Sequence, residues 1–137
     1  MQKSVGTIIG IIVIVAIGLY RNIPSWDEVD SKTVRLTDDQ AYTIQLEMKR
    51  SAKVKVTANE NNGKTIVAYW VNPEDHQAIQ SGTVDESIFT TVGNQLFFSD
   101  SSSGEGEATV PSGDVYVYVE CSDGGESDIT YSVSIYQ

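Results

Sequence analysis

Carboxylates suited to acid–base chemistry are plentiful in this 137-residue chain, but none lies in an apolar context that would raise its pKa. His76 is the single histidine, and it follows the polar stretch 73–75, which predicts a solvated loop side chain rather than a catalytic base. Cys121 is the single cysteine and ends an apolar run. It is expected to be buried and unbridged, with a bridge to another chain as the alternative. We therefore expect no enzyme activity and no cofactor.

Two acidic stretches supply the hard oxygen ligands that Ca²⁺ prefers. They lie at residues 100–107 and 123–128, and neither has the spacing of a helix–loop–helix calcium loop. Flexible acidic turns without an ion are the simpler interpretation, so no metal is expected. The calcium candidates are Asp100, Glu105, Asp123 and Asp128.

Tyrosines alternate with valines near the C-terminus. If the valines of the Val115–Val119 run face the core, Tyr116 and Tyr118 point outward, and Tyr136 is in the outward phase of the last segment. Exposed tyrosines in a row suit contact with a protein or a glycan, so these three are the predicted partner-binding residues. In the alternative interpretation they cover a sheet face or pack under the connection 72–87.

The elements that would position these side chains are strands. After Pro24, apolar and polar residues alternate with a period of two. The clearest segments are 42–48, 53–56, 115–119 and 129–135, a continuous apolar run lies at 65–71, shorter candidates lie at 88–91, 95–98 and 107–110, and one short helical turn fits 73–80. Eight or nine strands joined mostly by turns predict an all-β fold, an antiparallel β-sandwich with jelly-roll-like topology over residues 33–137.

This pattern resembles the pre-peptidase C-terminal domains and the GOLD-type luminal domains of cargo receptors, which are small extracytoplasmic β-sandwiches. The matching elements are Val34–Thr37 leading to Tyr42–Ile44, Lys53–Val56, Tyr69–Pro73, the proline-x-glycine and strand of Val110–Glu120, and the final Tyr131–Ile135. The resemblance implies an accessory, non-catalytic role. GOLD domains usually precede their transmembrane helix, whereas the apolar segment comes first here, so a cargo-receptor function is not implied.

The N-terminal residues 5–20 contain no charged side chain. As an α-helix they would extend about 24 Å, somewhat short of a bilayer core of ~30 Å. With Lys3 and Arg21 at its ends, this segment predicts a single-pass transmembrane anchor over residues 1–22, followed by a linker over 23–32. A cleaved signal peptide would need a small-x-small site, a pilin-like helix would continue past Pro24, and a buried helix would need a larger domain.

The flanking charges and two glycines refine this expectation. Lys3 precedes the apolar segment and acidic residues follow Arg21, which places the N-terminus in the cytoplasm and the β domain in the periplasm or outside the cell. Gly6 and Gly10 form a G-x-x-x-G that would permit close helix packing. The predicted partners are the lipid bilayer and other transmembrane or envelope proteins.

The net charge of −10 is unevenly distributed. Residues 26–64 carry seven bases and seven acids, whereas residues 65–137 carry twelve acids and no Lys or Arg. Such a surface repels phosphate backbones, so we expect no nucleic-acid partner. A solubilising acidic face is the simpler interpretation, and a homo-oligomer that joins the mixed half of one copy to the acidic half of another is the alternative.

These observations predict a membrane-anchored, non-catalytic accessory or structural subunit of a larger membrane or envelope assembly, whose extracytoplasmic β-sandwich makes protein contacts. A tethered ligand- or glycan-binding module is the alternative. A hydrolase that depends on His76 is the second rival.

Overall fold

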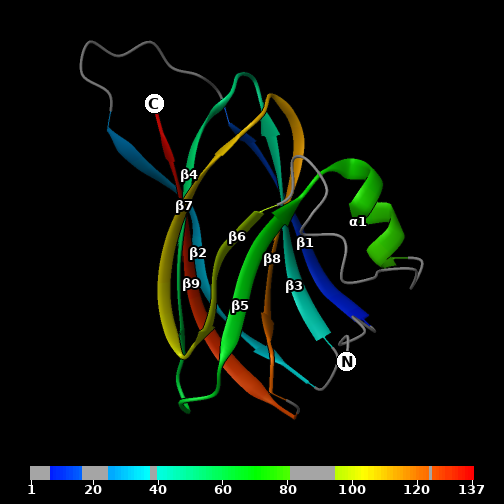
Figure 1. Ribbon diagram of the computed structural model, residues 1–137, viewed down its shortest axis with the longest axis vertical. Coiled ribbons are helices and arrows are strands. Elements are labelled where there is room, and N and C mark those ends of the chain that lie inside the picture. Colours follow the sequence, from blue (N-terminus) through cyan, green and yellow to red (C-terminus); the bar gives the residue numbers. More distant parts are fainter. Residues whose placement is uncertain (1–6, 17–24, 38–39, 81–94, 124) are drawn as a thin grey trace.

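Residues 7–16, 25–37, 40–80, 95–123 and 125–137 are described by a computed structural model of the chain (Figure 1). Its elements in chain order are β1 (Thr7–Ala16), β2 (Trp26–Leu36), β3 (Gln40–Met48), β4 (Ala52–Glu60), β5 (Ile66–Val71), α1 (Pro73–Gln80), β6 (Gln95–Ser101), β7 (Ser103–Val110), β8 (Gly113–Cys121) and β9 (Ser127–Tyr136). They form two sheets. Sheet A has the order β1-β3-β8-β5-β6, and sheet B has the order β2-β9-β4-β7.

The core lies between the two sheets and is built by residues that alternate along each strand. On β9, Ile129, Tyr131, Val133 and Ile135 are buried, while the residues between them face away from the core. Because successive side chains of a strand point to opposite faces, this alternation commits one face of each sheet to the core. The predicted all-β sandwich is therefore confirmed.

The connections agree with the jelly-roll prediction. From β2 to β9, consecutive strands lie in opposite sheets except β5 and β6, and β2 pairs with β9. The described strand pairs are antiparallel, with one exception: β1 pairs with β3 in parallel, at the edge of sheet A. Sheet A is thus not antiparallel throughout, whereas the prediction was an antiparallel sandwich.

The predicted transmembrane helix is not confirmed, because Thr7–Ala16 forms the strand β1 instead. β-Branched residues favour strands when a neighbouring strand satisfies the backbone, and this segment is rich in isoleucine and valine. In the described part of the chain, no helix is long and apolar enough to cross a membrane. Gly10 lies at a register irregularity of β1, where the helical spacing to Gly6 does not apply, and Gly6 lies outside the described residues.

Two other segments differ from the sequence-based expectations. The predicted linker 23–32 is largely strand, since β2 begins at Trp26. The predicted acidic loop 100–107 is mostly the end of β6 and the start of β7. Its alternation was hidden because serine, glycine and glutamate occupy most of its positions. The candidate strand 88–91 lies outside the described residues.

Candidate functional site

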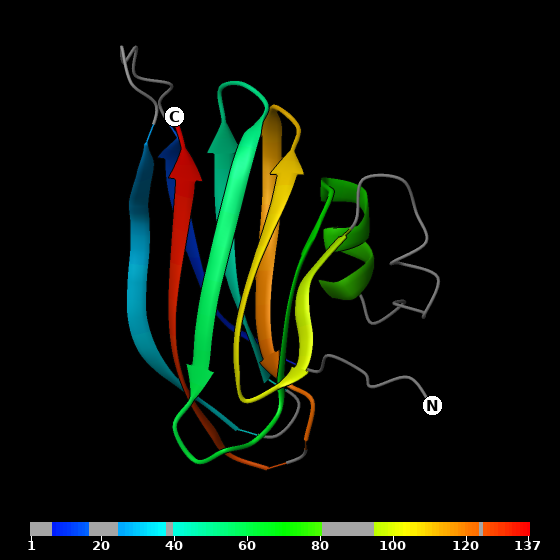
Figure 2. The same ribbon diagram turned by 60° about the vertical axis from the view of Figure 1, so that its left-hand side comes forward.

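Helix α1 lies on the outer side of sheet A, as Figure 2 shows. Asn72 begins it: its side-chain oxygen accepts a hydrogen bond of 2.9 Å from the amide of Asp75, and proline follows at the first helical position. The predicted short helix at 73–80 is confirmed. Ile79 on this helix is buried against Tyr69 and Tyr118 of the sheet, so the helix covers part of the outer face.

An aromatic cluster joins α1 to sheet A. It consists of His76 on α1, the rings of Tyr69, Tyr116 and Tyr118 on the sheet, and the carboxylate of Glu120. The His76 ring stacks on Tyr116 with centroids 3.7 Å apart and an interplanar angle of 5°. The His76 Nδ1 is 2.6 Å from the Tyr118 hydroxyl. The Tyr118 ring in turn stacks on Tyr69 at 5.2 Å, and the Tyr69 hydroxyl donates a 3.0 Å hydrogen bond to the Glu120 carboxylate. The polar groups of His76, Tyr118, Tyr69 and Glu120 are thus hydrogen-bonded in two pairs.

Burial determines the protonation of this aromatic cluster. It lowers the pKa of His76, because a buried imidazolium loses its hydration. Burial also raises the pKa of Tyr69 well above its ordinary value, and the charge of Glu120 raises it further. The pKa of Tyr116 is raised by burial, with smaller contributions from Asp114 and Glu47. At neutral pH the cluster therefore holds a neutral imidazole and neutral phenols.

These contacts correct two predictions. His76 is not a solvated loop residue, since only 5% of its surface is exposed. Tyr118 faces outward from the sheet but is fully buried, and Tyr116 is half-buried, so the predicted exposed stripe is wrong on β8. The spacing of His76 and Ile79 carried a signal, because residues three apart lie on one face of a helix. The cluster packs α1 onto the sheet.

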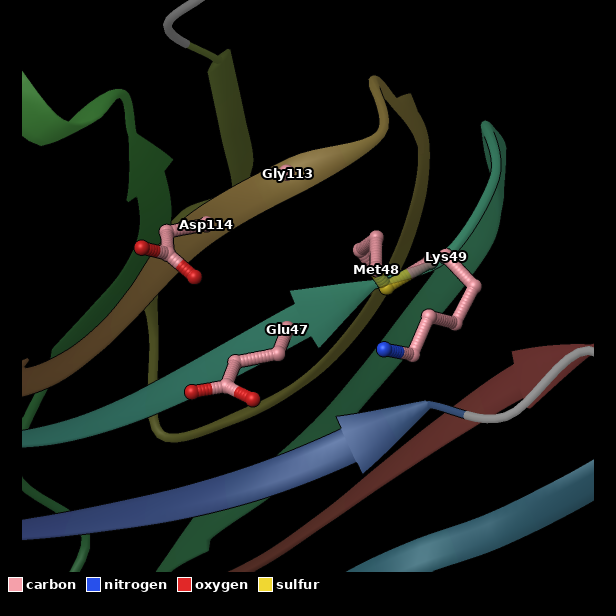
Figure 3. Close-up of a pocket in the computed structure, with 5 residues that line it drawn as sticks. All are labelled: Glu47, Met48, Lys49, Gly113 and Asp114. Atoms are coloured by element: carbon pink, nitrogen blue, oxygen red, sulfur yellow. The ribbon is translucent and has the colours of Figure 1, made fainter.

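An open pocket of about 230 Å³ lies near this cluster and is lined by Glu47, Met48, Lys49, Gly113 and Asp114 (Figure 3). Glu47 on β3 stands directly opposite Asp114 on β8. Like charges in such a cross-strand pair repel each other, so a cation is favoured beside them, and Lys49 lines the same pocket. Gly113 has φ of 100°, a conformation that disfavours other residues, and it begins β8 beside the pair.

The acidic calcium candidates are not gathered into a site. No group of three His, Cys, Asp or Glu side chains that could hold a metal occurs in the described residues. The Asp123 carboxylate accepts the amide of Thr65, and the Asp128 carboxylate accepts the side-chain amide of Asn61. Glu105 is exposed on β7, and Asp100 lies on β6. Asp123 and Asp128 therefore stabilise loops by accepting hydrogen bonds from them.

Sequence reasoning missed the carboxylate of Glu60, which is 3% exposed. It accepts hydrogen bonds from the backbone amides of Asn62, Lys64 and Asp128. Burial acts to raise the pKa of Glu60, but these amides stabilise the anion and the pKa is lowered overall. Glu60 thus fastens the β4–β5 turn to β9. The predicted burial of Cys121 is confirmed at the end of β8.

A second aromatic group lies on the other sheet. Tyr136 is 41% exposed, as predicted for this residue. Its ring meets that of Trp26 edge-on, with centroids 5.2 Å apart, and the Lys55 ammonium lies 4.3 Å from the Trp26 centroid. The three side chains come from β9, β2 and β4 of sheet B. They form a group that the sequence did not bring together, in which Tyr136 is exposed and Trp26 and Lys55 are half-buried.

The fold and these sites define a small two-sheet β-sandwich domain. The sequence matches no protein-family model and none of the curated proteins. Among solved structures, the chain is similar to the pre-peptidase C-terminal domain of a collagenase from Bacillus anthracis, with a TM-score of 0.53 and 11% identity over 90% of this chain and 94% of that one. It also matches PliG, a periplasmic inhibitor of g-type lysozyme from Aeromonas hydrophila, with a TM-score of 0.47 and 9% identity over 91% of this chain and 96% of that one.

The collagenase domain has the higher TM-score, and the statement about the fold rests on it. At 11% identity the likeness concerns the fold. The predicted resemblance to pre-peptidase C-terminal domains is thereby confirmed.

Proposed function

We propose that this chain is a non-catalytic binding module of a membrane or envelope assembly, and that it works outside the cytoplasm with sheet A toward its protein partners. The observation that carries this proposal is the composition of β1. Isoleucine, valine or alanine fills eight of its ten positions, Thr7 and Gly10 being the others, and both alternating sets of positions are apolar. A strand with water on one face alternates apolar and polar residues, as β9 does.

The position of β1 strengthens this argument. It forms the edge of sheet A, and β3 is its only strand partner in the described part of the chain. An apolar edge strand is a site of association with other chains unless something covers it. A protein partner or lipid would supply that cover, so the segment suits a protein that works in an assembly at a membrane.

The pocket on sheet A supports a protein contact. Glu47 and Asp114 offer two opposed carboxylates, and Tyr116 lies on the same face two residues after Asp114. Carboxylates and an aromatic ring together favour a cationic group. Lys49 lines the same pocket and offsets one of the two carboxylates, which leaves one negative charge that a lysine or arginine of a partner would fit.

Fractionation of cells that express the full chain tests the proposal. We expect the protein in the membrane pellet after an alkaline wash, and a variant with Ile11→Asp and Ile14→Asp in the soluble fraction, because charges oppose transfer into lipid or an apolar interface. The matched control is Ile11→Val with Ile14→Val, which stays in the pellet. A full chain that is soluble and monodisperse without detergent contradicts the proposal.

The protein contact is tested on the same material. Proteins that copurify with the solubilised full chain are quantified for Glu47→Gln with Asp114→Asn. The control pair, Glu105→Gln with Glu126→Gln, changes two exposed acids outside sheet A. We expect only the first pair to reduce recovery of the partners, and equal recovery from both pairs would place the contact elsewhere.

A further inference from the structure

The outer face of sheet B differs from the surfaces described so far, because no helix of the described chain lies on it (Figure 2). Its residues are the outward members of four alternating strands. They include Thr130, Ser132 and Ser134 on β9, with Ser31 and Thr33 opposite them on β2 and Thr57 opposite them on β4. The Thr33 and Thr130 hydroxyls are 2.8 Å apart. The sheet thus presents rows of hydroxyl groups to solvent.

The aromatic pair Trp26 and Tyr136 stands at one end of these hydroxyl rows, with Tyr136 exposed and Trp26 half-buried. Trp26 on β2 pairs with Tyr136 on β9. Lys55 on β4 pairs with Ser134, the next outward residue of β9. Lys55 is also opposed to Glu107 on β7. Aromatic rings, hydroxyls and paired charges therefore share one side of one sheet.

The charges around the aromatic pair balance. Lys53 and Lys55 are matched by Glu28 and Glu107, whereas the whole chain carries a net charge of −10. A polyanion or a polycation would find little net attraction at this end of the face. The face also lacks the apolar centre of a protein interface, since Tyr136 and Leu96 are the exposed large hydrophobic residues of the described chain and Leu96 lies on sheet A.

We propose that this face binds a neutral, extended glycan, with the exposed Tyr136 as the stacking ring, the half-buried Trp26 packed edge-on beside it, and Lys55, Ser134 and Glu107 as hydrogen-bonding groups. The C–H faces of a sugar ring pack on aromatic rings, and its hydroxyls need donors and acceptors beside those rings. A flat face suits several consecutive sugars rather than a buried small molecule. This proposal goes beyond the protein contact of sheet A and does not depend on it.

The test uses the full chain in detergent micelles and a panel of soluble, uncharged polysaccharides: hydroxyethyl cellulose, laminarin, galactomannan and N-acetylglucosamine oligomers. Affinity electrophoresis and calorimetry measure binding. We expect at least one member to bind, and Trp26→Ala and Tyr136→Ala each to weaken that binding about tenfold or more, as for central aromatic contacts. Leu96→Ala is the control for loss of an exposed hydrophobic side chain, and it keeps the wild-type affinity.

Two further readouts keep the test decisive. The emission of Trp70, which is buried in the core, reports that Trp26→Ala is still folded. Binding that is unchanged between low and high salt supports a neutral ligand, whereas salt-sensitive binding of heparin in preference to the panel overturns it. Absence of binding to every member at millimolar sugar, or equal binding by the wild type and the Trp26→Ala, Tyr136→Ala double variant, also overturns the proposal.

Discussion

The two outer faces of the sandwich are built from similar alternating strands, but only one of them is covered by a helix of the described chain. On sheet A, β8 turns Tyr116, Tyr118 and Glu120 outward, and α1 packs on the two tyrosines. On sheet B, β9 turns threonine, serine and Tyr136 outward, and no described helix covers them. Alternation fixes which residues face the core, but it does not tell whether the other face meets water. The size and polarity of the outward residues decide that.

The two faces also use tyrosine differently. Tyr118 holds its ring between Tyr69 and His76 and its hydroxyl against a buried imidazole. Tyr136 touches Trp26 and leaves much of its ring in solvent. A buried tyrosine stabilises the domain, whereas an exposed one at the end of a polar face is free for a ligand.

The largest difference is expected when the same side chain is removed from each face. Tyr118→Ala should lower the free energy of unfolding by about 3 kcal/mol, because a fully buried ring leaves a cavity and an unpaired His76. Tyr136→Ala, the matched control, should cost less than about 1 kcal/mol, since it loses mainly one edge-on ring contact. Urea denaturation followed by the emission of Trp70 measures both, and equal losses would show that the two faces are not different.

A smaller effect is expected from pH, and it arises on sheet A alone. The folded chain keeps His76 neutral because burial lowers its pKa, while the unfolded chain takes up this proton near pH 6.5. The unfolded state then binds more protons, so the contribution of His76 to stability is full above about pH 6.5 and declines as the pH falls below it.

The His76→Phe variant isolates this term, because phenylalanine keeps the stacking on Tyr116 and cannot titrate. Denaturation midpoints between pH 5 and 7.5 should rise with pH more steeply in the wild type than in the variant. Identical slopes would mean that His76 is open to water in the folded state. Glu60 does not confuse the result, because its lowered pKa moves its own loss of stability to more acidic solution.

Much of the fold followed from the sequence, and particular elements show why. The strands β8 and β9 could be predicted because valine and isoleucine alternate with polar or aromatic residues along their whole length. Helix α1 could be predicted from the Asn72–Pro73 start. The first part of strand β2, residues 26–32, was taken for a linker because charges fill it and a bulge between Glu28 and Asp30 breaks its period.

The sites were harder to predict because they depend on distant partners. Burial of His76 requires Tyr118, which is 42 residues away in the chain. The aromatic group on sheet B joins Trp26 to Tyr136 across the whole length of the domain. The N-terminal segment was ambiguous for another reason: a run of isoleucine and valine suits a strand beside β3 as well as a helix in lipid, and its surroundings decide.

Hydroxyl-radical footprinting of the full chain tests most directly whether one face is covered and the other open. Mass spectrometry compares the oxidation rates of individual aromatic residues in the same sample. We expect the exposed Tyr136 to be oxidised rapidly, the half-buried Trp26 more slowly, and the buried Tyr118 and Tyr69 to be protected. Oxidation of Tyr118 as fast as that of Tyr136 would contradict the account, because α1 would then not cover sheet A.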